Sequence, residues 1–291
     1  EDTPETLQKK VELATILGTI QSCFTDFKGL SRQWRRNTEE ERLLGVSLTG
    51  ILDSKMMSTT GKENITSLLS NLRLTAVSTN RKWAKYLGIE PSAAITCVKP
   101  SGTVSQLVDA ASGIHPRHSA YYIRTVRADK KDPLTKFMTE KGFPVEDELL
   151  KPQSMSVFSF PVKAPIGALT RSNLSAIDHL KVWQVYSNHW CEHKPSITVS
   201  IQENEWMEVG SYVYKNFDEM SGISFLPMSE HTYKQAPYQD TTRKDYEDLL
   251  KKMPKNVDWQ ALSEYEEEDN TMGSQTLNCT GDVCEIVDLV R

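Results

Sequence analysis

The sequence lacks any run of eighteen apolar residues, so we expect no membrane-spanning helix. It has no long run of Lys or Arg, and its 34 basic and 39 acidic residues leave a net charge of −5, which argues against nucleic acid as the main partner. Its five cysteines are an odd number spread along the chain, unlike a secreted disulfide framework, and its first residues do not resemble a signal peptide. We therefore expect a soluble, cytoplasmic protein. A chain of 291 residues is long enough for one large α/β domain or two smaller ones.

A turn with the character of a phosphate site lies at Lys99-Pro100-Ser101-Gly102-Thr103. The apolar segment 93–98 before it is typical of a buried strand, and the apolar residues after it recur at helical spacing. A strand that turns through Pro-Ser-Gly into a helix leaves backbone N–H groups unpaired at one spot, where the helix dipole favours an anion. The alternative is an ordinary helix cap at a surface turn. The candidate phosphate-binding residues are Pro100, Ser101, Gly102, Thr103, Val104 and Ser105.

Further along the chain, the sequence predicts a strand–helix–strand unit. Residues 195–201 alternate strictly, with β-branched apolar side chains on one face and hydroxyls on the other. A helix over 203–217 and a strand over 222–226 follow, which makes part of the sheet parallel. Ligands on parallel sheets bind at the carboxyl ends of the strands, where the Pro-Ser-Gly turn also lies. This agreement favours the phosphate interpretation.

The remaining elements are predicted from helix caps and from periodicity. Thr38 and Glu41 form a capping-box pattern, which predicts a helix that runs on to Leu52. Other helices are expected at 3–23, 64–87, 133–141, 175–190 and 242–252, and strands at 121–127 and 154–160.

The end of the chain differs in composition from the rest. The acidic run 264–270 has too little apolar surface to offset chain entropy, so we expect a mobile linker there. This divides the chain into a folded part, 1–262, and a tail, 263–291. The tail carries Cys279 and Cys284, five positions apart with a glycine between them. A redox pair, a metal-ligand pair and two unrelated cysteines all remain open, although two thiols without a nearby histidine make a four-ligand zinc site unfavourable.

Two other clusters contain residues of the kinds that bind metals. His115 and His118 lie three apart around a proline, which breaks a shared helical face, so local hydrogen bonding is the favoured interpretation. His189, Cys191 and His193 are spaced by two and would line up only on a strand. We therefore expect no metal site.

Several longer motifs, taken together, resemble one enzyme family. They are residues 39–50 (EEERLLGVSLTG), 99–103 (KPSGT), 115–124 (HPRHSAYYIR), 190–199 (WCEHKPSITV) and the terminal cysteine pair. Similar segments occur in the same order in the adenosylcobalamin-dependent ribonucleoside-triphosphate reductases, which are the monomeric class II ribonucleotide reductases. The resemblance runs nearly from end to end of the chain.

The resemblance implies a fold, a reaction and a set of partners. The fold is a ten-stranded α/β barrel, of which this chain would be the C-terminal part. The reaction converts ribonucleoside triphosphates to 2′-deoxyribonucleoside triphosphates through a thiyl radical that adenosylcobalamin initiates. The Pro-Ser-Gly-Thr turn would hold the substrate phosphates. Cys279 and Cys284 would re-reduce the active-site disulfide and would themselves be reduced by a thioredoxin-type dithiol.

One family motif has no counterpart in this sequence. The family carries its radical cysteine and its general-base acid in an Asn-Pro-Cys-x-Glu pattern, which is absent here, and Cys23, Cys97 and Cys191 lie in other contexts. The Asp-x-His-x-x-Gly pattern of base-off cobalamin modules is absent too, so the cofactor is implied by the resemblance alone. We therefore expect an incomplete reductase that needs its upstream N-terminal part. The alternatives are a non-catalytic nucleotide-binding subunit that completes a partner chain, and a stand-alone thiol-disulfide oxidoreductase.

Overall fold

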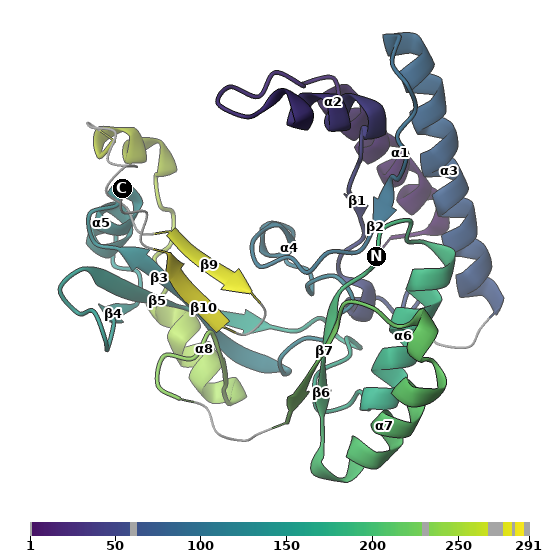
Figure 1. Cartoon of the computed structure of the whole chain (residues 1–291). Coiled ribbons are helices and arrows are strands. Elements are labelled where there is room, and N and C mark those ends of the chain that lie inside the picture. The colour runs from purple at the N-terminus through teal and green to yellow at the C-terminus, as the bar shows by residue number, and fades with distance from the viewer. Residues whose placement is uncertain (1, 59–62, 229–232, 267–275, 281–282, 288–291) are drawn as a thin grey trace. The chain divides into compact units, whose positions relative to one another are not determined.

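The computed structural model of the chain describes residues 2–58, 63–228, 233–266, 276–280 and 283–287 (Figure 1). Two compact units can be distinguished: unit 1 comprises residues 1–117 and 166–228, and unit 2 comprises residues 118–165 and 229–291. Both units contain helices and strands, so the expected α/β class is confirmed. No helix within the described ranges is both long enough and apolar enough to cross a membrane.

Two helices of unit 1 pack against each other, α1 (Pro4–Gln21) and α3 (Glu63–Leu87). The start of α1 follows the sequence pattern, because the Thr3 hydroxyl accepts a hydrogen bond from the Thr6 amide and a proline occupies the first turn. Both helices agree with the predicted ranges to within two residues at each end.

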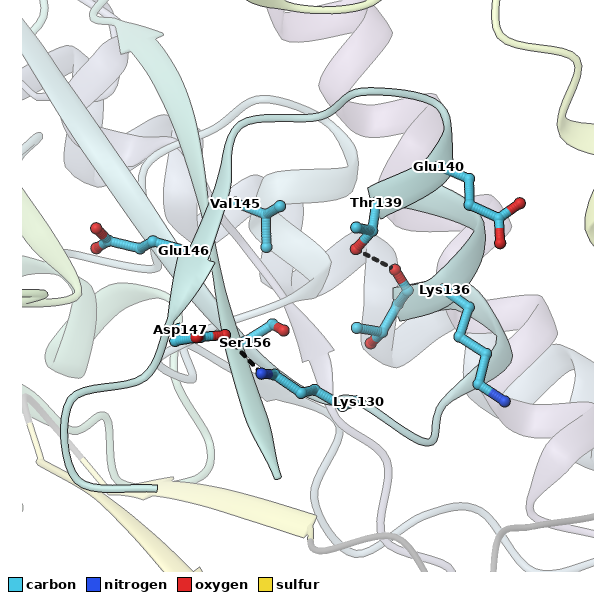
Figure 2. Close-up of a pocket in the computed structure, with 9 residues that line it drawn as sticks. Lys130, Lys136, Thr139, Glu140, Val145, Glu146, Asp147 and Ser156 are labelled. Atoms are coloured by element: carbon cyan, nitrogen blue, oxygen red, sulfur yellow. Dashed lines mark hydrogen bonds and ion pairs between the residues drawn. The ribbon is translucent and has the colours of Figure 1, made fainter. Parts of the chain in front are cut away.

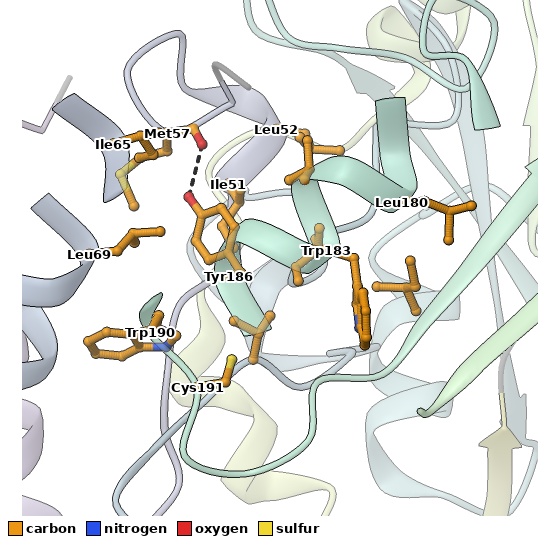
Figure 3. Packing of buried hydrophobic residues seen from close by; sticks show 14 of the residues in the cluster. Ile51, Leu52, Met57, Ile65, Leu69, Leu180, Trp183, Tyr186, Trp190 and Cys191 are labelled. Atoms are coloured by element: carbon orange, nitrogen blue, oxygen red, sulfur yellow. Dashed lines mark hydrogen bonds between the residues drawn. The ribbon is translucent and has the colours of Figure 1, made fainter. Parts of the chain in front are cut away.

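The core of unit 1 forms where α3 meets α6 (Ala176–His189), a helix capped by the Ser175 hydroxyl (Figure 3). Trp183 and Tyr186 of α6 are almost fully buried. Each large side chain still satisfies its polar atom: the Tyr186 hydroxyl donates to the Met57 carbonyl at 2.9 Å, and the Trp183 indole donates to the Pro195 carbonyl at 3.0 Å.

The predicted strand–helix–strand unit is confirmed. Strands β6 (Ile197–Ile201) and β7 (Ile223–Pro227) run parallel, and α7 (Trp206–Lys215) crosses between them. The three apolar residues of β6 are buried and alternate with two half-buried hydroxyl residues. Short 3₁₀ turns, η2 (Glu203–Glu205) and η3 (Phe217–Glu219), flank the crossing helix.

A second parallel pair, β1 (Val46–Ser47) and β2 (Thr96–Cys97), leads into the Pro-Ser-Gly turn. The pairing continues on the N-terminal side, where the amides of Leu44 and Val46 donate to the carbonyls of Ala94 and Ile95 at 3.0 and 2.9 Å. Residues 44–47 are therefore extended, although the sequence pattern predicted a helix for them.

The prediction of a helix over 38–52 is wrong, and the structure gives the physical reason. Helix α2 (Arg32–Glu41) contains Thr38 in its interior and ends at Arg42, whose φ is 45°. After β1, Gly50 takes a φ of 70° and the chain enters a short 3₁₀ helix, η1 (Ile51–Asp53). The apolar residues that suggested a helical face are buried instead through strand pairing and a turn.

Unit 2 is built on an antiparallel sheet in the order β4-β5-β3-β8. Its strands are β4 (Val145–Asp147), β5 (Met155–Lys163), β3 (Tyr121–Asp129) and β8 (Tyr238–Asp240), and its helices are α5 (Pro133–Glu140) and α8 (Arg243–Lys252). Near the C-terminus, β9 (Thr276–Thr280) and β10 (Val283–Val287) form a separate antiparallel pair.

A small second core holds unit 2 together around Phe137, which is fully buried. The 3₁₀ helix η4 (Trp259–Glu264) contributes to it, since Trp259 and Tyr265 contact the Phe137 ring at centroid distances of 5.5 and 5.4 Å. The acidic residue Glu264 thus belongs to a segment that packs on this core. The sheets of the two units are partial within the described ranges, and no ten-stranded barrel is formed by them.

Candidate functional site

The Pro-Ser-Gly-Thr turn lies at the surface of unit 1, directly after β2. Pro100, Gly102 and Thr103 are exposed and Ser101 is half-buried, whereas Ser105 is fully buried. The turn is therefore accessible to a ligand and is anchored at one end.

Two serines fix the shape of the turn. The Ser101 hydroxyl accepts a hydrogen bond from the Ser105 amide at 2.8 Å, and the Ser105 hydroxyl donates to the Ser101 carbonyl at 2.6 Å. The Ser101 amide donates to the Ser112 hydroxyl at 2.6 Å. Within the described part of the chain, the amides of Thr103 and Val104 have no acceptor. These two N–H groups are available to an anion.

The helix after the turn is short, as the sequence predicts, and it ends before the last of the apolar positions. Helix α4 spans only Val104–Leu107, and Asp109, with a φ of 47°, turns the chain away. Four residues sum too few peptide dipoles for a strong macrodipole. Any anion affinity at this turn must therefore come from its local amides and hydroxyls.

A buried ion pair supports the loop behind the turn. The guanidinium of Arg117, 3% exposed, donates to both carboxylate oxygens of Asp53 at 2.9 and 2.8 Å and to the Asp109 carbonyl at 2.6 Å. Asp53 also accepts the Ala111 amide at 2.8 Å. Bidentate, charge-assisted bonds of this kind hold a fixed geometry, and removal of one partner would leave a buried charge without compensation. This pair ties η1 to the loop 109–117.

The same loop reaches the first residue of the turn. Gly113 has a φ of 53°, and a Cβ there would lie 3.0 Å from the Lys99 carbonyl oxygen, so only glycine fits this close approach. The Gly113 amide donates to the Thr49 hydroxyl at 3.3 Å, and the Lys99 amide donates to the Ser47 hydroxyl at 3.1 Å. Residues from two separated segments, 47–49 and 113, thus hold the strand end that precedes the turn.

The segment 190–193 forms hydrogen bonds with β2 and with the residue before it. The Glu192 carboxylate accepts the amides of Ile95 and Thr96 at 2.9 and 3.3 Å. The Trp190 indole donates to the Cys97 carbonyl at 2.7 Å. Glu192 thus supports the turn as a structural group, and its carboxylate is already occupied.

His115 is engaged at both ring nitrogens, which agrees with the local hydrogen bonding expected for it. Its Nδ1 donates to the Ser112 carbonyl at 3.0 Å, and its Nε2 accepts the Thr198 amide at 3.0 Å. His118 lies in unit 2, with its Nε2 3.4 Å from an Asp240 carboxylate oxygen. Among the described residues, no group of three or more His, Cys, Asp or Glu side chains is placed to hold a metal ion.

Two cysteines near the turn are buried: Cys97 lies in β2, and Cys191 follows α6. Cys97 and Cys191 are both free thiols. Burial raises the pKa of the Cys97 thiol, and burial together with the neighbouring Cys97 raises the pKa of Cys191 to about 12. Because the thiolate is the reactive form, neither group is suited to thiol–disulfide exchange at neutral pH.

The tail cysteines occupy opposite positions of a β-ladder. The register of β9 and β10 pairs Cys279 directly with Cys284. Paired residues of antiparallel strands have Cα atoms about 4.5–5.5 Å apart, which is within the range that a disulfide requires. The backbone thus brings together the two residues that the sequence singled out.

Unit 2 contains a cavity of about 540 Å³ that nothing in the sequence indicated (Figure 2). Lys130 donates to the Asp147 carboxylate at its edge, and the Thr139 hydroxyl donates to the Thr135 carbonyl at 2.7 Å. Two lysines and three carboxylates line it, so its charge favours no one class of ligand. The full lining is Lys130, Thr135, Lys136, Thr139, Glu140, Val145, Glu146, Asp147 and Ser156.

Sequence reasoning missed the residues that hold the turn in place. The segment 113–117 drew attention as a motif, but nothing indicated that Arg117 pairs with Asp53, 64 positions away. Glu192 likewise contacts β2 across 97 positions. A pattern of covarying positions would be the signal for such pairs, and one sequence does not contain it.

Comparisons with known proteins show what the chain as a whole is similar to. No family model matches the chain. A reductase of Euglena gracilis is 27% identical over 263 residues, which cover 88% of this chain and 35% of the relative, and one of Levilactobacillus brevis is 26% identical over 241 residues, which cover 73% of this chain and 32% of the relative. Both are adenosylcobalamin-dependent ribonucleoside-triphosphate reductases. This chain is similar to that reductase family. The resemblance seen in the motifs is confirmed.

A solved structure extends the similarity to the fold. The crystal structure of a B12-dependent class II ribonucleotide reductase superposes with a TM-score of 0.75 at 22% identity, over 90% of this chain and 40% of that one. The chain therefore has the fold of part of a class II reductase. It spans about a third of the length of the reductases it matches.

Proposed function

We propose that this chain is the C-terminal portion of a ribonucleoside-triphosphate reductase. Joined to an upstream portion, it would complete a ten-stranded α/β barrel that converts a ribonucleoside triphosphate and a dithiol to a 2′-deoxyribonucleoside triphosphate, a disulfide and water. The radical cysteine would come from the upstream portion. The match covers only about 35% of the length of the Euglena gracilis relative, which supports a reductase made of this chain and an upstream portion.

The turn at residues 100–105 would hold the substrate phosphates. The observation that carries this proposal is the pair of unoccupied amides at Thr103 and Val104, on an exposed turn whose shape is fixed by buried groups. Preorganised N–H donors bind phosphate oxygens without the cost of ordering a loop. The turn is open at Gly102, where no described atom lies within 4 Å of the position that a Cβ would take.

Cys279 and Cys284 would act as the shuttle that returns the active-site disulfide to the dithiol state. Each transfer would proceed by attack of a thiolate on a disulfide sulfur, so that one disulfide forms as another is reduced. A thioredoxin-type dithiol would then reduce the tail disulfide. The paired register of β9 and β10 supports a closed disulfide form of this tail.

Adenosylcobalamin would serve the assembled reductase, as the names of the relatives state for those proteins. Three histidines of unit 1 use ring nitrogens in hydrogen bonds within the protein. Both nitrogens of His115 are engaged, His193 donates to the Leu44 carbonyl at 2.7 Å, and His179 donates to the Ile114 carbonyl at 2.8 Å. His115, with both nitrogens engaged, is therefore not available as a cobalt ligand.

A reconstitution experiment tests the proposed function. This chain is mixed with the upstream reductase portion, adenosylcobalamin, a ribonucleoside triphosphate and reduced thioredoxin, and deoxynucleotide is measured by chromatography. Product should form only when both chains are present. Nucleotide binding without product would instead indicate a non-catalytic subunit, and insulin reduction by the chain alone would indicate a thiol oxidoreductase.

A further inference from the structure

The inner face of helix α1 is only partly apolar, because the buried Val11 shares it with two hydroxyl residues. The face that packs inward includes Thr15 and Thr19, both fully buried. Their hydroxyls donate to the carbonyls four residues before them at 2.7 Å, and Asn80 of α3 donates to the Thr19 hydroxyl at 3.0 Å. Hydroxyl groups satisfied in this way occupy the side of a helix that apolar residues normally fill.

The outer face of α1 carries further apolar side chains that are exposed. Leu13, Leu17 and Ile20 are spaced by four and three positions, which puts them on one face of a helix. Their exposed fractions are 58%, 68% and 39%, and Phe24, just past the helix end, is 73% exposed. We call these four residues the α1 stripe.

Apolar exposure continues beyond the stripe into the next helix. Phe27 and Leu30 are exposed, and so is Trp34 of α2. Single exposed apolar residues are ordinary on a protein surface, but several along one helix face and the segment that follows it favour an interaction site.

We propose that the α1 stripe is the surface on which the upstream portion of the reductase docks. This inference rests on the proposed function. About two thirds of the length of the matched relatives lies outside this chain, and that portion must bury apolar surface against this one to close a common core. The stripe offers an apolar helix face whose opposite side already packs on α3. The occupant is thus a large folded segment of reductase, packed on α1 by helix or sheet.

The variant pair that tests this inference is Leu13→Glu with Leu17→Glu, against Leu149→Glu with Leu150→Glu as the matched control. The control leucines lie in unit 2 and are 57% and 87% exposed, so both variants add two charges at exposed leucines. Binding to the upstream reductase portion, produced as a separate chain, is measured by titration calorimetry. Circular dichroism and thermal melting establish that both variants fold.

The stripe variant should bind the upstream portion at least about tenfold more weakly than the wild-type chain, while the control variant binds as the wild type does. Equal binding by the stripe variant, or no complex with the wild-type chain, would overturn the inference. So would sedimentation that shows a wild-type dimer which the stripe variant abolishes, since a second copy would then be the occupant. Triphosphate binding by each variant alone separates the docking proposal from the proposed phosphate site. A variant that loses docking but keeps triphosphate binding reports on the α1 stripe. A failure to bind triphosphate with docking intact reports on the turn.

Discussion

The backbone of Gly113 lies against the carbonyl oxygen of Lys99, so close that a Cβ at position 113 would come within 3.0 Å of that oxygen. The Val98 side chain is nearly as near, at 3.2 Å. This contact joins the loop 109–117 to the residue that opens the turn. The shape of the candidate phosphate site therefore depends on a residue outside it.

Gly113→Ala should lower both stability and triphosphate affinity. Its φ of 53° strains any other residue by about 1–2 kcal/mol, and the contact with Lys99 adds to that cost. Gly88→Ala is the matched control, because Gly88 has a φ of 70° but no described atom within 4 Å of a Cβ. Urea denaturation should show the larger loss for Gly113→Ala, and only that variant should bind triphosphate more weakly. Equal losses of stability would mean that the contact contributes nothing.

His179 should make the protein less stable as the pH falls. The ring is 3% exposed, and burial, with His115 nearby, lowers its pKa from 6.5 to about 4. In the unfolded chain the ring takes up a proton near pH 6.5, whereas the folded protein keeps it neutral until about pH 4. The free energy of unfolding should therefore fall as the pH drops through this window, by at most about 3 kcal/mol.

Urea denaturation at pH 7.5, 5.5 and 4.5 measures this dependence. His179→Gln keeps an N–H donor for the Ile114 carbonyl but has no group that titrates in this range. The variant should be less stable at pH 7.5 and should lose less stability on acidification. If wild type and variant lost equal stability between pH 7.5 and 4.5, the buried histidine would not be the cause.

Cys279→Ser should separate single from multiple turnover in the reconstituted reductase. The serine blocks the tail exchange, so thioredoxin should no longer support repeated turnover, while a pre-reduced enzyme should still complete one. Cys23→Ser is the control, because Cys23 is an exposed thiol in unit 1 and should leave both readouts unchanged. Loss of the single turnover in Cys279→Ser would rule out a pure shuttle role.

Local patterns in the sequence predicted several elements well. The alternation over 195–201 correctly predicted β6, and the Thr3-Pro4 pattern correctly predicted the start of α1. These elements depend on side chains that are near one another in the sequence. The helix predicted over 38–52 failed because strand pairing with 94–97 decides that segment, and such pairing is not encoded locally.

The candidate site divides in the same way. The turn itself was recognisable from its residues, because glycine, proline and hydroxyl residues have local roles. The residues that hold the turn in place could not be recognised in this way. Their hydrogen bonds join residues 64 to 97 positions apart in the sequence, as for Arg117 with Asp53 and for Glu192 with Ile95. Nor did the apolar spacing of Val104 and Leu107 indicate that both side chains would be exposed.

Whether the turn binds substrate phosphates can be measured with Gly102→Ala. A methyl group at position 102 meets no described atom within 4 Å, so the variant should fold with its free energy of unfolding changed by no more than about 0.5 kcal/mol. Gly210→Ala, at a position that is equally open, is the control. Titration calorimetry with a ribonucleoside triphosphate should show an affinity at least about tenfold lower for Gly102→Ala than for the wild type or Gly210→Ala. Identical affinities for all three proteins would contradict phosphate binding at this turn.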